Sequence, residues 1–262
     1  MRAVIAPRTL LHRLELDLRV RRCLGGGRGY EPEMRFLRAL CSRSDTSIDV
    51  GANMGLYTYQ LRRHSACCHA LEPHPVLAMG LASARLKGVQ VHRLALSDRA
   101  GSAVLRVPVN DAAGYEHHGH STIDDQNNLS LAGDVSIRQL EVQLLTLDDF
   151  VVEHRISRIG FMKVDVEGHE LAVLRGGEHT LRRDTPNILV ELEERHHPGT
   201  VVATKEMLAD LGYRCFFLEG GVWHEADERK TNVSSGARSG DVSTRNFLFA
   251  PVLPAGLVFD RS

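Results

Sequence analysis

The sequence predicts a doubly wound α/β domain with a mostly parallel sheet. Short apolar runs that fit buried strands alternate with longer runs at helical spacing, which is typical of strands joined by right-handed helical crossovers. A glycine-containing turn follows the first strand, and acidic residues follow several later ones. With 262 residues, 43% hydrophobic and 25% charged, the chain has the composition of an ordinary globular protein.

The expected elements follow one another regularly except in the middle of the chain. The pattern predicts strands at 47–50, 67–71, 89–96, 102–107, 159–166, 188–192, 215–218 and 247–249, with an alternating stretch at 137–147. It predicts helices at 33–41, 56–63, 75–86, 170–182 and 204–211. The polar, histidine-containing stretch 110–134 has no apolar period, and an ordered loop of that length is uncommon unless it is functional. We therefore expect this stretch to form a lid over the substrate site or one wall of that site.

Residues 1–45 predict a helical extension to a main domain at 46–262. The extension is rich in arginine and amphipathic, so we expect it to pack on the domain or on a second subunit of a homodimer, with a membrane-surface helix as the alternative. The net charge of −1 gives no electrostatic argument for nucleic acid. No apolar run approaches the ~20 residues of a membrane span. The five cysteines have no CxxC spacing, which favours a cytoplasmic protein with reduced thiols.

A glycine turn connects the first strand to the first helix. Its residues are Asp49-Val50-Gly51-Ala52-Asn53-Met54-Gly55, and Glu72 ends the second strand. Gly51 and Gly55 allow a tight turn and a close approach to a ligand, and ligands of open parallel sheets bind beyond the carboxyl ends of the strands. The Glu72 carboxylate can accept hydrogen bonds from both hydroxyls of a ribose. The turn and this acid together predict a site for a nucleoside-containing cofactor, with candidates Asp49, Gly51, Ala52, Asn53, Gly55 and Glu72.

The spacing of the glycines distinguishes between cofactors. A dinucleotide site requires G-x-G-x-x-G, whereas this turn has G-x-x-x-G, which disfavours an oxidoreductase. Asp49 would repel a pyrophosphate, but it suits the cationic amino-acid end of S-adenosylmethionine. Ser97 and Asp98 follow the third strand, where Asp98 can accept the adenine amine. The alternative for both residues is a turn cap.

The candidate catalytic residues are Asp165, Glu167 and His169, which follow the strand predicted at 159–166. Together with Glu170 they would place several carboxylates at one strand end, where these would repel one another unless they faced N–H groups, a cation or substrate hydroxyls. Asp165 is the first candidate to orient an acceptor or to take its proton. His169 is a candidate because imidazole titrates near neutral pH. Simple helix initiation is the alternative reading of this acidic stretch.

These segments resemble the FkbM family of methyltransferases over residues 47–193. The resemblance rests on the glycine turn, Glu72-Pro73, the stretch 95–98, Lys163-Val164-Asp165-Val166-Glu167-Gly168-His169-Glu170, and the segments 173–177 and 188–191. It implies a Rossmann-like sheet of seven strands with the last strand antiparallel. It also implies methyl transfer from S-adenosylmethionine to a hydroxyl of a sugar, glycolipid, polyketide or other small-molecule acceptor.

Two alternatives to O-methylation stay open. N-methyltransferases often carry an Asn/Asp-Pro-Pro-Tyr element after the fourth strand, where this chain has Asp165-Val166-Glu167-Gly168. A protein that binds S-adenosylmethionine without catalysis is the second alternative. His117, His118 and His120 with Asp124 and Asp125 do not form a strong ligand set, so we expect no metal ion.

Overall fold

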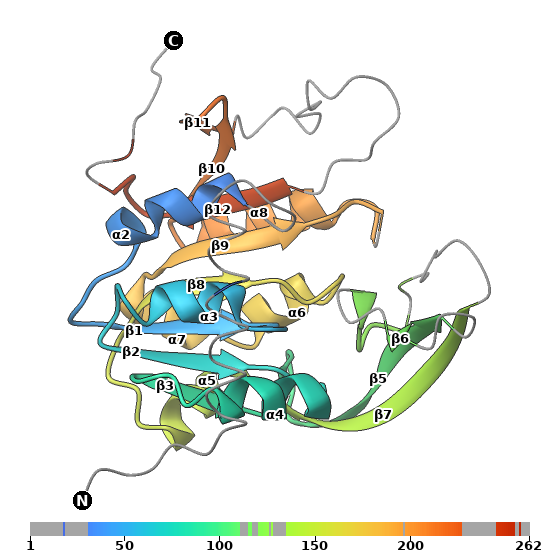
Figure 1. The fold of residues 1–262 in the computed structure, drawn as a ribbon. Helices are drawn as coiled ribbons and strands as arrows, with labels where there is room; N and C mark the ends of the chain where they lie inside the picture. Colours follow the sequence, from blue (N-terminus) through green and yellow to red (C-terminus); the bar gives the residue numbers. More distant parts are fainter. Residues whose placement is uncertain are drawn as a thin grey trace, which may run out of the picture.

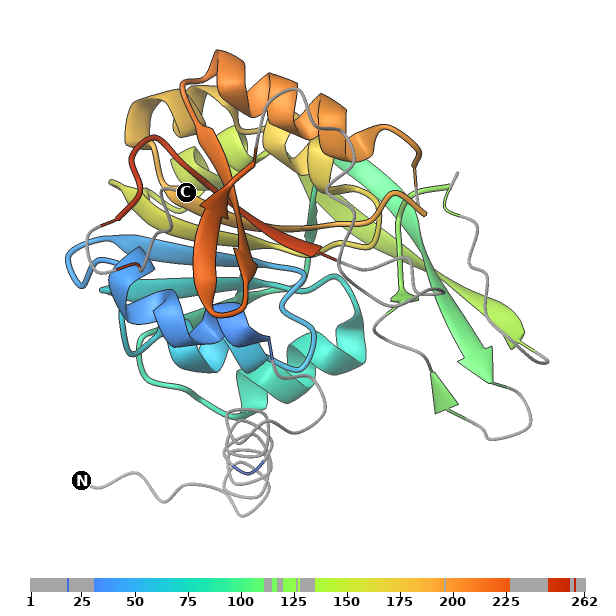
Figure 2. The same ribbon diagram turned by 90° about the horizontal axis from the view of Figure 1, so that it is seen from above.

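An eight-stranded sheet with helices on both faces forms the centre of the protein, which confirms the predicted doubly wound α/β class (Figures 1 and 2). The computed structural model describes residues 18, 31–110, 115, 116, 120–125, 127, 135–195, 197–226, 245–254 and 257. In spatial order the strands are β11 (Val222–Glu225), β10 (Arg214–Glu219), β12 (Arg245–Ala250), β9 (Asn187–Leu192), β8 (Ile159–Val164), β1 (Thr46–Val50), β2 (Cys67–Leu71) and β3 (Val89–His92).

The strand directions agree with the family resemblance. Strands β9, β8, β1, β2 and β3 pair in parallel, and β12 runs antiparallel to both of its neighbours, β9 and β10. The sheet has one strand more than the predicted seven, because β11 forms a hairpin with β10 at the edge. The additional strand lies far from the carboxyl ends of β1 and β2.

Two layers of apolar side chains separate the sheet from its helices. On one face Ile48, Val50, Met162 and Val164 pack in the same core as side chains from the helices after β7 and β8. On the other face Phe161 packs with residues of the helices before β1 and before β2. The helices are η1 (Pro32–Phe36), α2 (Leu37–Leu40), α3 (Leu56–Leu61), α4 (Pro75–Ser83), α5 (Leu147–Glu153), α6 (Glu170–Arg175), α7 (Glu178–Asp184) and α8 (Thr200–Asp210).

A second sheet extends from one side of the domain (Figure 1). It contains β4 (Ala95–Leu96), β5 (Gly101–Asn110), β6 (Tyr115–Glu116) and β7 (Val135–Leu145), and β5 pairs with β7 along its whole length. The prediction of one strand over 89–96 was therefore wrong, because β3 belongs to the main sheet and β4 to the second. The main-sheet pairing ends at His92, whose partner Leu71 is the last residue of β2.

Two helix predictions also need correction. The helix expected over 170–182 is divided between α6 and α7 at Gly176 and Gly177. A Cβ at Gly176 would lie 2.0 Å from the Ser97 carbonyl oxygen, so the glycine allows the chain to pass close to that segment. Helix α5 was not predicted, although Thr146 caps it by accepting a hydrogen bond from the Asp149 N–H at 3.0 Å.

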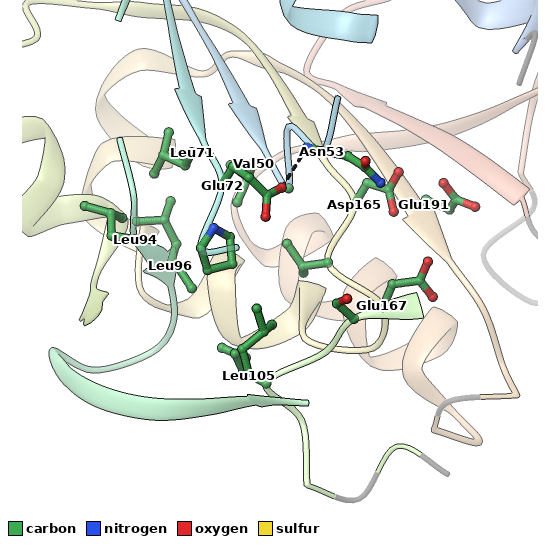
Figure 3. A pocket seen from close by; sticks show the side chains of 16 residues that line it. Val50, Asn53, Leu71, Glu72, Leu94, Leu96, Leu105, Asp165, Glu167 and Glu191 are labelled. Atoms are coloured by element: carbon green, nitrogen blue, oxygen red, sulfur yellow. Dashed lines mark hydrogen bonds between the residues drawn. The ribbon is translucent and has the colours of Figure 1, made fainter. Parts of the chain in front are cut away.

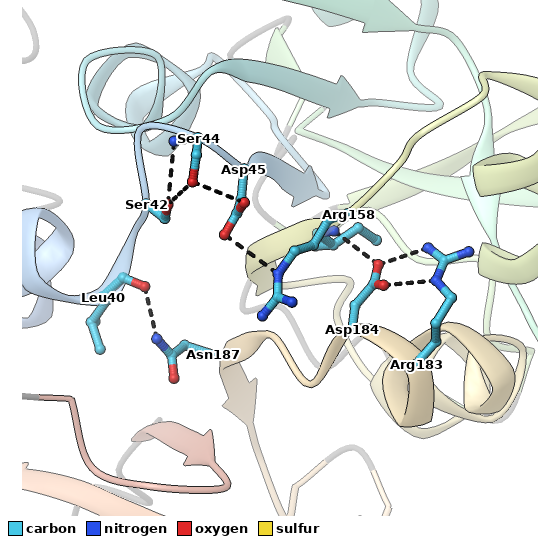
Figure 4. Close-up of polar contacts among 9 residues, drawn as sticks. Leu40, Ser42, Ser44, Asp45, Arg158, Arg183, Asp184 and Asn187 are labelled. Atoms are coloured by element: carbon cyan, nitrogen blue, oxygen red, sulfur yellow. Dashed lines mark hydrogen bonds and ion pairs between the residues drawn. The ribbon is translucent and has the colours of Figure 1, made fainter.

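Polar contacts fix the amino ends of the central strands, opposite the end where the glycine turn lies (Figure 4). The buried Asp184 carboxylate accepts the Ile159 N–H at 2.8 Å and pairs with Arg183. Asn187 donates to the Leu40 carbonyl at 2.8 Å. These contacts tie β8 and β9 to α7 and α2, so the strands are held in register at the end away from the site.

The described part of the predicted extension begins at Glu31. Met34 and Leu37 of this part are buried in one cluster with Phe161 and Trp223. Of the residues before Glu31, the structure describes only Leu18, so the arginines of this segment lie outside the described residues. The same is true of most of the stretch 110–134, including His117 and His118.

Candidate functional site

The glycine turn lies where three parallel strands end. The Gly51 and Ala52 N–H groups both donate to the Leu71 carbonyl at 3.0 Å, which joins the turn to β2. Gly51 and Gly55 adopt left-handed φ values of +80° and +85°. A Cβ at Gly51 would lie 1.8 Å from the Asp165 carbonyl oxygen. The glycine is therefore required by the close approach of the β8 end, a reason that the sequence did not reveal.

Glu72 ends β2 and is bound by the turn. One of its carboxylate oxygens accepts the Asn53 N–H at 2.7 Å (Figure 3), and the other accepts the His74 N–H at 2.8 Å. The residue is 5% exposed, and this burial raises the pKa of Glu72 to about 7 despite the two N–H donors. A carboxyl group that is partly protonated near neutral pH can accept a hydrogen bond and also donate one.

A pocket of about 770 Å³, counting the space open at its mouth, lies over these strand ends (Figure 3). Apolar side chains form one wall and four carboxyl groups line the rest. The lining residues include Leu71, Leu94, Leu96, Leu105, Asn53, Glu72, Asp165, Glu167 and Glu191.

Two polar atoms in this pocket are buried and have no hydrogen-bond partner among the described residues. They are Asn53 Oδ1 and Ser121 Oγ. A buried polar atom without a partner costs about 1–3 kcal/mol, so both atoms are available to a ligand. Asn53 also has a left-handed φ of 49°, which directs this part of the turn toward the pocket.

A loop from the second sheet closes one side of the pocket. Ser121 and Ile123 belong to its lining, as expected for a wall of the site. Arg106 of β5 holds the loop by donating to the Asn127 carbonyl at 3.1 Å. Asn127 in turn donates from its amide to the Glu167 carbonyl at 2.6 Å, which connects the loop to the end of β8.

A second cavity of about 590 Å³ adjoins the first, and Gly51, Asn53 and Asp165 line both. Asp49 and Ala52 line only this second cavity. The Asp49 carboxylate is 2% exposed and accepts a hydrogen bond from the Thr58 hydroxyl. Burial raises the pKa of Asp49 to about 6. Its carboxylate therefore lies behind the glycine turn, away from the main pocket.

A buried lysine lines the second cavity. Lys163 is 1% exposed, and its Nζ lies 3.8 Å from Asp165 Oδ2, 3.6 Å from Glu191 Oε2 and 3.8 Å from Glu31 Oε2. It donates to Asn246 Oδ1 at 2.7 Å. Burial alone would lower the pKa of Lys163, but the surrounding carboxylates raise it above its usual value. The lysine is therefore a permanent cation beneath Asp165.

Four predicted site residues lie outside the pocket lining. Gly55 faces Leu81, and Asp98 pairs with Arg99 near the surface at 3.3 Å. Ser97 and His169 contact each other, with 2.9 Å between Ser97 Oγ and His169 Nε2, and burial lowers the pKa of His169.

Glu167 and Glu170 have different positions in the acidic stretch. Glu167 lines the pocket and lies 3.7 Å from Arg195. Glu170 is 3% exposed, and its Oε1 accepts the Val166 and Gly168 N–H groups at 3.1 Å each. Glu170 therefore closes the turn before α6, as the helix-initiation reading expected.

Sequence reasoning assigned no role to Lys163, Glu31 or Asn246. A charged residue in the middle of an apolar strand was a usable signal for Lys163, because such a group is buried only with partners. Glu31 and Asn246 gave no signal, since each belongs to a distant segment that the fold brings to the site.

The comparisons with known proteins agree with this geometry. The sheet order, the glycine turn and the acids after β2 and β8 define the class of α/β methyltransferases. The chain belongs to the FkbM family: the family description "Methyltransferase FkbM domain" matches residues 49–215, which confirms the predicted resemblance.

Relatives of this family differ considerably from the chain. "Methyltransferase sdnD" of Sordaria araneosa is 31% identical over 63% of this chain and 72% of its own length. "31-O-demethyl-FK506 methyltransferase FkbM" of Streptomyces tacrolimicus is 30% identical over 58% and 65%. The crystal structure of methyltransferase FkbM from Methylobacillus flagellatus KT is 13% identical with a TM-score of 0.49, over 79% of this chain but only 44% of that chain.

No group of three or more His, Cys, Asp or Glu side chains in the described ranges is arranged to hold a metal ion. None of the helices in the described part of the chain is long and apolar enough to cross a bilayer.

Proposed function

We propose that the chain transfers a methyl group from S-adenosylmethionine to a hydroxyl oxygen of a sugar, glycolipid, polyketide or other small-molecule acceptor. The observation that carries the proposal is one pocket whose lining includes both Glu72 and Asp165. An acid after β2 suits ribose hydroxyls, and an acid after β8 suits an acceptor that loses a proton. Membership of the FkbM family supports the same reaction class.

The residues present fit this cofactor. Asn53 Oδ1 and Ser121 Oγ are buried acceptors without partners in the described residues, and both face the pocket. The Glu72 carboxylate is fixed by two N–H groups in a position to hold the ribose. The leucine side chains of the opposite wall suit the adenine ring. Asp49 lines the second cavity, which adjoins the pocket, so its acidic side chain suits the cationic amino-acid end there.

Asp165 is the residue that we assign to the acceptor. S-adenosylmethionine, when bound, supplies a methyl group on a sulfonium, which an oxygen nucleophile attacks in line. Asp165 lies in the pocket wall with 32% of its side chain exposed, so an acceptor hydroxyl can reach it. The Lys163 Nζ lies 3.8 Å from Asp165 Oδ2. Asp165 is therefore suited to orient the hydroxyl and to take its proton.

Oxygen as the methylated atom has separate support. The name of the Streptomyces relative, 31-O-demethyl-FK506 methyltransferase, refers to a methyl group on oxygen. A nitrogen acceptor needs no strong base when it attacks as a free amine, whereas a hydroxyl does. The carboxyl groups after β8 and β9 therefore favour a hydroxyl over an amine.

The cofactor assignment is tested by calorimetric titration of the purified protein with S-adenosylmethionine and, separately, with NADH. We expect micromolar binding of S-adenosylmethionine that Glu72→Ala weakens at least about tenfold, or ~1.4 kcal/mol. Asp98→Ala tests the predicted adenine contact, and Glu206→Ala on the exposed side of α8 is the control. Preferential NADH binding, or no binding of either compound, would overturn the cofactor assignment.

The acceptor assignment is tested with methyl glycosides, glycolipids, macrolides and primary amines. We expect Asp165→Asn to retain cofactor binding and to lower methyl transfer by about 10²-fold or more, the usual contribution of a general base. Carbon NMR of the labelled product distinguishes O-methyl from N-methyl groups. An N-methyl product would replace the proposal with the amine alternative. Cofactor binding without transfer to any acceptor would favour the non-catalytic one.

A further inference from the structure

The register of the main sheet places Glu191 beside Asp165. Val164 pairs with Val190 in the parallel β8–β9 ladder, so the next residue of each strand lies side by side. Because side chains alternate along a strand, Asp165 and Glu191 emerge on the same face as Lys163. Figure 3 shows their carboxyl groups next to each other at the pocket wall.

The charges in this cluster do not balance if every acid is ionised. The Lys163 ammonium lies within 3.6–3.8 Å of carboxylate oxygens of Glu31, Asp165 and Glu191. Glu31 has donors of its own, since its Oε2 accepts the Tyr57 hydroxyl at 2.6 Å and the Asn246 amide at 2.8 Å. Asp165 and Glu191 are left to share the one ammonium.

Two adjacent, partly buried carboxyl groups that share one cation favour a state in which they hold one proton between them. Burial first, and then the charge of Asp165, raise the pKa of Glu191 to about 9, while Lys163 lowers it. Glu31 adds to the rise, and Arg195 is the other cation that interacts with Glu191. Burial, Asp165 and Glu31 favour the proton on Glu191, and together they outweigh the opposing charge of Lys163.

We propose that Asp165 and Glu191 form a one-proton carboxyl pair above Lys163, in which Glu191 holds the proton and Asp165 receives the proton of the acceptor hydroxyl. Glu191 and Lys163 are then positioning residues that act through Asp165. The second half of this inference rests on the proposed function, whereas the shared proton does not.

The proton transfer balances within the pair. The acceptor O–H bond breaks with its electron pair remaining on oxygen, which uses that pair in its new bond to the methyl carbon. The proton passes to Asp165, so the pair changes from one proton to two and from a charge of −1 to neutral. With the cofactor bound, its methyl–sulfur bond would break with the electron pair left on sulfur, so the positive charge of the sulfonium and the negative charge of the pair would be lost together. The pocket is open for the proton to return to solvent.

Infrared difference spectroscopy tests the pair without any ligand. We expect the wild-type minus Glu191→Gln spectrum to contain a protonated-carboxyl C=O band at pH 8, which disappears as the pH rises through about 9. Glu193→Gln is the matched control, because this acid lies two residues further on and is ion-paired with Arg195. The control should leave the band unchanged.

A second variant tests the coupling. Asp165→Asn removes the neighbouring charge, so we expect the band of Glu191 to titrate at least about one pH unit lower. The absence of a band that depends on Glu191, or a midpoint that Asp165→Asn does not move, would overturn the proposal. Neither outcome depends on methyl transfer, so failure here is distinguishable from failure of the cofactor titration.

Discussion

Gly51→Ala is the substitution whose effect follows most directly from the structure. Any residue other than glycine at its φ of +80° incurs about 1–2 kcal/mol of backbone strain. The added Cβ would also lie 1.8 Å from the Asp165 carbonyl oxygen. That oxygen belongs to the backbone, and the Asp165 N–H is held by the Val50 carbonyl at 3.0 Å, so the chain must shift. Overpacking of this kind costs about 1–3 kcal/mol more.

Two other glycines separate these contributions. Gly88 has a similar φ of +77° but open space where a Cβ would lie. Backbone strain alone should therefore lower the free energy of unfolding of Gly88→Ala, by ~1–2 kcal/mol. Gly80 lies in α4 with ordinary φ and open space, so Gly80→Ala should gain about 0.5–1 kcal/mol. Gly51→Ala should lower the free energy of unfolding by about 2–5 kcal/mol, the sum of the strain and the overpacking.

Urea unfolding followed by circular dichroism measures the three free energies of unfolding, and calorimetry measures cofactor binding by the folded fraction. We expect Gly51→Ala also to weaken binding, since the displaced segment carries Asp165. If Gly51→Ala is no less stable than Gly88→Ala, the close approach to the β8 end does not constrain the turn and the reasoning is refuted.

Two further predictions concern stability. Thr146→Ala should lower the free energy of unfolding by about 1 kcal/mol, because the Asp149 N–H loses its hydrogen-bond acceptor. Thr146→Ser keeps a hydroxyl at this position and should retain most of that free energy. Equal losses for the two variants in urea unfolding would contradict the role of Thr146 as a cap. His69 and His92 stack with 3.0 Å between His69 Nδ1 and His92 Nε2, and burial lowers the pKa of each to about 4. Since the unfolded imidazoles bind protons near pH 6.5, their contribution should be complete above that pH and decline as the pH falls toward 4. The difference in unfolding free energy between the wild type and His92→Gln should shrink as the pH falls from 6.5 to 4. A difference that stays constant would contradict the lowered pKa values.

The sequence predicted which strand ends line the pocket better than it predicted the carboxyl cluster around Lys163. Glu72 and Asp165 each follow a strand in a parallel sheet, and parallel strands bring their carboxyl ends to one edge. Glu31 and Asn246 reach the same place only through tertiary packing, which no local pattern encodes. Ser97 and His169 had suitable positions along the chain, yet their side chains contact each other outside the pocket.

The fold was predictable where strands alternate with helices and less so at its irregular points. The division of the strand at 89–96 depends on where β2 ends, because the partner strand limits the pairing. The division between α6 and α7 depends on the close passage of Gly176 past Ser97. Both are contacts between distant segments, so periodicity within one segment could not show them.

The hydrogen bond between Asn246 and Glu31 joins residues 215 positions apart. During synthesis the glycine turn and Glu72 emerge from the ribosome early, whereas β12 is among the last elements to emerge. Until then Lys163 lacks the amide oxygen that it donates to in the finished protein. A chain that ends before β12 therefore contains the glycine turn and Glu72 but lacks one hydrogen-bond partner of Lys163.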